Sequence, residues 1–192
     1  MSLPFPDAGL TDGTLTLRRW RPDDLDALVA ACQDPEIPRW TSVPSPYTDD
    51  TGRWFLGRCD EWWDAGTDLP LAIVDTGGLL GATGIHRIGA DADAPGLDGL
   101  ADEVGYWLAA GARGRGVVTR AVVLLTGWCF TRLDRPTLWL RAHPDNERSL
   151  AVARRCGFRD TGTTMRDDAD PSAPLVVFRR DRDDPVDDAS FS

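Results

Sequence analysis

The sequence predicts an α/β protein with a mixed central sheet and flanking helices, and three observations support this class. Short β-prone runs alternate along the chain with segments of helical length. One apolar run, residues 103–108, leads through a glycine-rich turn into an apolar helix, an arrangement typical of α/β proteins. The sequence Asp75-Thr76-Gly77-Gly78 separates two other apolar runs and predicts an antiparallel hairpin.

Length and composition indicate one globular domain. The chain has 192 residues, of which 42% are hydrophobic, so it is long enough to bury a core. We assign residues 13–180 to the domain, residues 1–12 to an N-terminal extension and residues 181–192 to an acidic, flexible tail. There is no apolar run of the ~20 residues that a membrane span needs, and the N-terminus lacks the pattern of a signal peptide. The four cysteines have no CxxC spacing, so we expect a cytoplasmic protein with reduced thiols and no metal.

The first third of the chain is predicted to contain one strand and two helices. Residues 13–20 alternate in polarity and predict the strand. Pro22 and two aspartates then open a helix, whose apolar residues recur at helical spacing as far as Cys32. Residues 34–48 contain four prolines, so we expect an ordered loop rather than a helix. Residues 49–65 give the second helix, with a heavy aromatic face.

The remainder is predicted to alternate strands and helices after the first hairpin. Strands are expected at residues 69–74, 79–88, 103–108, 137–142, 157–163 and 175–180. Helices are expected from Val117 and after Asn146, which is a good N-cap. A right-handed crossover should make the strand at 137–142 a parallel neighbour of the one at 103–108. Residues 89–100 read as a mobile loop rich in glycine, aspartate and alanine.

The turn before the apolar helix has the properties of an anion site. Gly111, Gly114 and Gly116 punctuate it, and Arg113 and Arg115 add positive charge to a protein whose net charge is −10. A helix start exposes unpaired backbone N–H groups at the positive end of the helix dipole. Phosphate is the usual occupant of such a site.

Three kinds of phosphate-binding site use a glycine-rich turn at a helix start, and two of them fit this sequence poorly. A Walker A loop needs a lysine, and this chain has none, which excludes that route to ATP or GTP. A dinucleotide fold places its glycines near the start of the domain and an acidic residue after the next strand. Here the glycines come past the middle, and the next strand ends in Arg141-Ala142-His143. The six residues 113–118 taken alone could also be an ordinary strand-to-helix turn.

Three segments resemble the GNAT superfamily of acyl-CoA N-acyltransferases. Arg-Gly-Arg-Gly-Val-Val at residues 113–118 resembles its (Gln/Arg)-x-x-Gly-x-(Gly/Ala) signature, with Val118 departing at the last position. Residues 146–158, NERSLAVARRCGF, resemble the Asn-x-x-(Ala/Ser)…Gly-Phe stretch that follows the next strand. LRRWRPDDLDAL, near the N-terminus, resembles the opening of the ribosomal-protein N-terminal acetyltransferases, the RimJ/RimL-type branch.

The resemblance implies a GNAT fold, in which parallel strands of the mixed sheet splay apart, and acetyl-CoA as the co-substrate. The pantetheine arm is expected to pair with the strand backbone at Val104, Tyr106, Trp107 and Leu108. The CoA pyrophosphate is expected on the turn and helix start, at Arg113, Gly114, Arg115, Gly116, Val117, Val118 and Thr119. Asn146 and Ser149 are the remaining expected CoA contacts.

Transfer of an acetyl group to an amine calls for a general base and a proton donor. Glu103 is our candidate base because it opens the central strand, where the resembling branch often carries an acidic residue. His143 and His86 are rival bases, since only imidazole titrates near pH 7 without a shift. The tyrosine that many GNAT proteins use to protonate the CoA thiolate is replaced by Ala153. The branch resemblance makes Ser149 the candidate acid instead.

The acceptor is expected to be an amine, either a peptide N-terminus or a small molecule. An acidic protein is unsuited to nucleic acid and compatible with a cationic acceptor. Trp40 and Tyr47 could line the acceptor pocket or anchor their loop on the core, and the aspartates of the loop 165–174 could attract a cation. The sequence is also compatible with a homodimer. The alternative functions are the same fold with another acyl donor, such as succinyl-CoA, and a non-catalytic acyl-CoA sensor.

Overall fold

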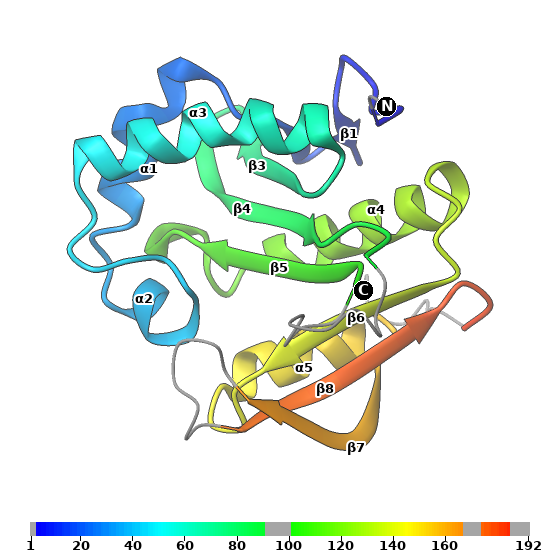
Figure 1. Ribbon diagram of the computed structural model, residues 1–192. Coiled ribbons are helices and arrows are strands. Elements are labelled where there is room, and N and C mark those ends of the chain that lie inside the picture. Colours follow the sequence, from blue (N-terminus) through cyan, green and yellow to red (C-terminus); the bar gives the residue numbers. More distant parts are fainter. Residues whose placement is uncertain (1–2, 91–100, 167–173, 185–192) are drawn as a thin grey trace.

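The computed structural model describes residues 3–90, 101–166 and 174–184, which form one mixed sheet with helices on both faces (Figure 1). Its strand order is β1-β2-β3-β4-β5-β6-β8-β7. The strands are β1 (Leu10–Thr11), β2 (Thr16–Arg19), β3 (Leu69–Asp75), β4 (Gly78–His86), β5 (Glu103–Leu108), β6 (Thr137–Ala142), β7 (Arg159–Arg166) and β8 (Pro174–Asp181). The helices are α1 (Leu25–Ala31), α2 (Glu36–Trp40), α3 (Asp49–Ala65), α4 (Val117–Arg132) and α5 (Glu147–Arg155).

The core lies mainly between the sheet and α4, the helix that the sequence showed as apolar on nearly every side. Leu125 and Ala121 of α4 are fully buried against strand residues such as Leu71 and Leu138. Burying a leucine side chain contributes roughly 2 kcal/mol. A second, smaller cluster joins α1 and α3 to the opposite face of β3 and β4. The sheet is therefore covered on both sides at its centre, as an α/β class requires.

The parallel strands β5 and β6 touch at one end and then separate. β5 pairs with β4 over its whole length, from His86↔Glu103 to Gly81↔Leu108. β6 pairs over its whole length with β8, whereas the parallel register between β5 and β6 consists of Glu103↔Trp139 alone. Each strand follows its antiparallel partner, so a wedge opens between them, as Figure 1 shows. The splayed mixed sheet that the sequence predicted is confirmed.

The hairpin of β3 and β4 is also confirmed. The Asp75 carboxylate accepts a hydrogen bond of 2.7 Å from the backbone N–H of Gly77. Gly78 adopts a φ of 118°, which a residue with a side chain would adopt only under strain. A side chain that accepts a backbone hydrogen bond and a glycine at positive φ are the two features for which aspartate and glycine predict a turn.

The prediction that residues 34–48 contain no helix was wrong at α2. Pro35 caps this helix and Pro38 lies in its first turn, where a missing N–H breaks no helical hydrogen bond. Asp34 supports the helix start, because its carboxylate accepts a hydrogen bond of 3.0 Å from the N–H of Glu36. Ile37 fixes the helix on the protein with 2% of its surface exposed.

Two predicted loops fall largely outside the described residues. These are most of the loop at 89–100 and the segment 167–173, which includes Asp167, Asp168 and Asp170. Among the described residues, no helix is long and apolar enough to cross a membrane. All four cysteines are buried free thiols, as expected.

Candidate active site

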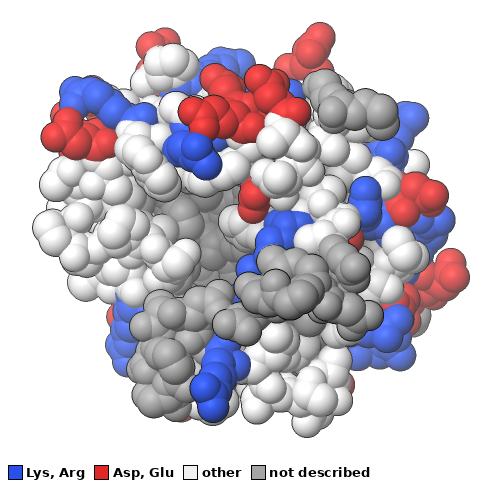
Figure 2. Space-filling model, in the orientation of Figure 1, with Lys and Arg blue, Asp and Glu red and all other residues white. Residues whose placement is uncertain are grey.

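A cavity of about 1450 Å³ runs through the wedge between β5 and β6. One part of its lining comes from the turn before α4 and the start of α5, and another part comes from α1, α2, α3 and the end of β4. Figure 2 shows this face hollowed, with acidic side chains gathered over α3 above the hollow. We call the part lined by the turn and by α5 the donor half, and the part lined by α1, α2, α3 and the end of β4 the acceptor half.

The donor half is built around an uncapped helix start. Gly116 occupies the N-cap of α4 with a φ of 69° and gives no side-chain cap. Gly114 has a φ of 76°, and no atom lies within 4 Å of the position that a Cβ would take at either glycine. Among the described residues, the N–H groups of Val117, Val118 and Thr119 have no acceptor. This concave row of donors, next to glycines that leave space, fits a diphosphate.

The two arginines of the turn are held by carboxylates of neighbouring elements. Arg113 pairs with Asp34 at 2.7 Å and also donates to the carbonyl of Leu108 at 3.0 Å. Arg115 lies 3.6 Å from Asp75 with about half of its side chain exposed. The sequence had suggested that both charges serve the phosphate directly. In this structure Arg113 fixes the turn to β5 and to the start of α2, whereas the backbone N–H groups of residues 117–119 are left without a protein acceptor among the described residues.

Ser149 and Tyr106 form a hydroxyl pair across the wedge. Asn146 caps α5 as predicted, accepting from the N–H of Ser149 at 3.1 Å. The Ser149 hydroxyl lies 2.8 Å from the Tyr106 hydroxyl. Burial raises the pKa of Tyr106, although the hydrogen bond to Ser149 acts in the opposite direction. Ala153 is fully buried one turn further along, so a phenolic hydroxyl reaches this region from β5 rather than from α5.

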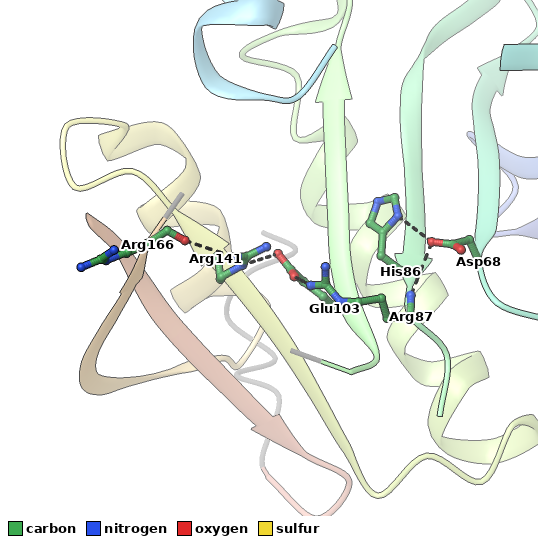
Figure 3. Close-up of polar contacts among 6 residues, drawn as sticks. All are labelled: Asp68, His86, Arg87, Glu103, Arg141 and Arg166. Carbon is green, nitrogen blue, oxygen red and sulfur yellow. Dashed lines mark hydrogen bonds and ion pairs between the residues drawn. The ribbon is translucent and has the colours of Figure 1, made fainter. Parts of the chain in front are cut away.

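Glu103 lies where β5 and β6 begin to separate, but both of its carboxylate oxygens are occupied. One accepts from Arg87 and the other from Arg141, the latter at 2.9 Å (Figure 3). Only 13% of the Glu103 side chain is exposed. Two guanidinium groups compensate one negative charge. Such a carboxylate is better suited to holding β4, β5 and β6 together than to taking a proton from a substrate.

The two histidines, both of which line the cavity, differ in the hydrogen bonds of their rings. In His143, Nδ1 accepts from the backbone N–H of Asp145 at 3.1 Å, and the ring packs on Trp40 with 5.4 Å between centroids. In His86, Nδ1 lies 3.1 Å from a carboxylate oxygen of Asp68. Burial alone would raise the pKa of Asp68, but its hydrogen bond and charge interaction with His86, together with hydrogen bonds from Thr67 and Arg87, leave the pKa below its usual value. Figure 3 shows this pair at the end of β4.

Aromatic side chains dominate the wall of the acceptor half. The rings of Trp20, Phe55, Trp62 and Trp54 contact one another in sequence, with centroids 5.5, 6.2 and 6.2 Å apart. Trp54 is 61% exposed at the outer end, whereas Trp20 is 7% exposed. Tyr47 is buried in the same cluster and lines the cavity, so it both anchors its loop and contributes to the wall.

Comparison with known proteins places this architecture in one family. Residues 14–159 match the acetyltransferase (GNAT) domain family. An uncharacterized N-acetyltransferase, p20, of Bacillus licheniformis is 26% identical over 151 residues, covering 77% of this chain and 80% of the relative. The ribosomal L7/L12 α-N-protein acetyltransferase RimL, solved with coenzyme A, superposes with a TM-score of 0.75 at 20% identity, over 91% of this chain and 97% of that one. The microcin C7 self-immunity acetyltransferase MccE, solved with acetyl-CoA and AMP, gives 0.77 at 19% identity, over 92% and 98%.

The chain therefore belongs to the GNAT acetyltransferase family. The fold class, the enzyme class (acyl-CoA N-acyltransferase) and acetyl-CoA as co-substrate are confirmed as the sequence predicted them.

Proposed function

We propose that the protein acetylates the N-terminal α-amine of a protein or peptide in the cytoplasm, in the manner of the RimJ/RimL-type branch. The observation that carries this proposal is the single cavity that joins an uncapped helix start to an open acceptor half. Structures of similar fold include an acetyltransferase of a ribosomal-protein α-amine. Four unpaired thiols support a reducing compartment.

The donor half would bind and orient the thioester. The amides of residues 117–119 would hold the diphosphate, and the edge of β5 that faces the wedge would pair with the pantetheine arm. The thioester supplies an activated acyl carbon. Ser149, with the Tyr106 hydroxyl as its partner, would donate a proton to the departing thiolate. This hydroxyl pair takes the place of the tyrosine that Ala153 replaces.

The acceptor half would admit the amine past the aromatic wall toward the polar side chains at the end of β4. Beyond their parallel contact at Glu103 and Trp139, the strands β5 and β6 separate, which leaves room for a peptide end. We propose that Glu103 keeps Arg87 and Arg141 in place and so maintains the wedge. The sequence-based role of Glu103 as a base stays a prediction that its two ion pairs weigh against. The same holds for His143, whose Nδ1 is already an acceptor.

The proposal is tested by following CoA release with acetyl-CoA and a panel of amines. The panel should contain short peptides with free N-termini, the same peptides N-terminally blocked, and small amines. We expect release that depends on a free α-amine. Calorimetry shows whether acetyl-CoA binds. Binding without amine-dependent release would favour the acyl-CoA sensor, and turnover with succinyl-CoA in preference to acetyl-CoA would favour the other donor.

A further inference from the structure

The end of β4 presents an imidazole whose orientation is fixed by a carboxylate. His86 Nδ1 lies 3.1 Å from Asp68, and a carboxylate can only accept a hydrogen bond. The neutral ring therefore carries its hydrogen on Nδ1 and keeps a lone pair on Nε2. Asp68 is held in turn by the backbone N–H of Arg87, at 3.4 Å. His86 is thus oriented with its basic nitrogen away from Asp68.

That nitrogen lies over the strand along which the thioester arm is proposed to run. His86 is paired with Glu103 in the β4–β5 register, and side chains of opposed residues share one face of a sheet. Two residues along the same face of β5 comes Gly105. A Cβ at Gly105 would lie 2.8 Å from Nε2 of His86, which is too close for two unbonded heavy atoms. The missing side chain makes room for the ring, which lines the cavity, and 53% of the His86 side chain is exposed to solvent.

The other groups near the wedge are less suited to accept a proton. Glu103 already accepts from Arg87 and Arg141. His143 accepts at Nδ1 from a backbone N–H, so its neutral ring carries the hydrogen on Nε2 and has no lone pair left there. The charged groups around His86 are therefore Asp68 on one side and the Glu103–arginine network on the other. Of Glu103, His143 and His86, only His86 offers the cavity a basic nitrogen for which the described residues show no hydrogen-bond partner.

We propose that His86 is the general base of acetyl transfer and that Asp68 is its positioning residue. This inference rests on the proposed function. Nε2 takes one proton from the acceptor ammonium, and the neutral amine then attacks the thioester carbonyl, forming the C–N bond. The C–S bond breaks, and the thiolate takes a proton from the Ser149–Tyr106 pair. The second amine proton restores that pair, and His86 returns its proton to solvent, so one proton is released for each amide formed.

The test compares His86→Gln with wild type by the pH dependence of kcat/KM. Wild type should lose activity on acidification, because a protonated imidazole cannot accept the proton of the amine. In H86Q we expect kcat/KM to fall roughly 10²–10⁴-fold at pH 7 and this acidic limb to disappear. The deficit should narrow toward pH 9, because an α-amine of pKa about 8 is then already neutral. The acetyl-CoA affinity should stay within about threefold of wild type, a range well under 1 kcal/mol.

Asp68→Asn is the second variant. Its matched control is Asp145→Asn, which changes the carboxylate beside His143. D68N keeps the imidazole but removes the negative charge that favours its protonated form. Its acidic limb should therefore move to lower pH, and kcat/KM at pH 7 should fall roughly tenfold because the ring is no longer held in position. A merely structural role for Asp68 would lower the rate without moving the limb. D145N alters an 80% exposed carboxylate and should leave the limb in place.

Three results would overturn the inference. One is an H86Q enzyme within threefold of wild type that keeps its acidic limb. Another is loss of the limb in His143→Gln or Glu103→Gln while H86Q retains it. The third is a D68N limb that does not move, which counts against the dyad even if H86Q fails to fold. A wild-type protein that binds acetyl-CoA but turns over no amine would instead overturn the proposed function itself, and the base with it.

Discussion

The two halves of the cavity differ in the chemical groups that line them. The donor half consists of backbone groups placed by one glycine turn, two helix starts and the edge of β5. The acceptor half consists of side chains from α1, α2, α3 and the end of β4, brought together only by the fold. The first kind of site depends on a few short segments, and the second on residues spread along the chain from Trp20 to His86.

This difference separates binding of the co-substrate, which needs only general features, from recognition of the amine, which needs particular side chains. Backbone amides at a helix start bind any diphosphate in much the same way. In our proposal, aromatic rings and one imidazole–carboxylate pair select and deprotonate a specific amine. Substitutions in the donor half should therefore act on acetyl-CoA binding, and those in the acceptor half on the amine and on the pH dependence.

The largest effect is expected from Gly116→Val in the donor half. The φ of 69° at this N-cap is unfavourable for valine by roughly 1–2 kcal/mol, and the branched side chain would occupy space beside the helix N–H groups. We expect acetyl-CoA affinity to fall at least roughly 100-fold, or 2.7 kcal/mol, by calorimetry. Gly127→Val, at an exposed position of the same helix, is the matched control and should bind normally. Equal affinities in the two variants would mean that the turn does not bind the diphosphate.

Removal of the hydroxyl pair comes next. Ser149→Ala and Tyr106→Phe should each lower kcat by roughly 10–10²-fold with little change in the KM for acetyl-CoA. Because the two hydroxyls lie 2.8 Å apart and act as one donor, the double variant should lose little more than either single variant. Losses that multiply would show that the two groups act independently.

Glu103→Gln distinguishes two roles of Glu103, the general base that the sequence suggested and the structural role that its ion pairs indicate. If Glu103 maintains the wedge through Arg87 and Arg141, kcat should fall less than about tenfold and the acidic limb should remain. A loss of 10²-fold or more, together with loss of the limb, would return the role of base to Glu103. Steady-state rates over pH 5.5–9 measure both quantities.

The smallest effect is expected at Arg18 and Asp24, which join β2 to the start of α1 beneath the acceptor half. Burial alone would raise the pKa of Asp24, but the bidentate pair with Arg18, 2.7 Å at each contact, and the backbone N–H and charge of Arg21 together lower it. A carboxylate whose pKa is lower in the folded state adds stability above its unfolded value of about 3.9, and this is lost as the pH falls through the folded value.

Asp24→Asn should therefore cost about 1–2 kcal/mol at pH 7, and the cost should shrink as the pH approaches 3. Urea unfolding at several pH values measures it, and acetyl-CoA affinity should be unchanged. A cost that does not vary with pH would show that the ion pair is not its source.

The sequence predicted the local structure of the donor half, because its signals act within a few residues. Glycines at positive φ, the Asn146 cap and the apolar α4 each act within a few residues of where they are read. Helix α2 was missed because four prolines suggest a loop, although the first turn of a helix tolerates them. The pairing of Tyr106 with Ser149 and the contact of His86 with Asp68 could not be read, because they join residues 43 and 18 positions apart. Only strand register reveals that Gly105 leaves space for an imidazole.

The most direct test of the account is a crystal structure of the protein with CoA. We predict phosphate oxygens within hydrogen-bonding distance of the N–H groups of residues 117–119, and a pantetheine arm along β5 with its sulfur near Ser149 and His86. Diphosphate bound elsewhere, with those N–H groups facing only solvent, would contradict the account.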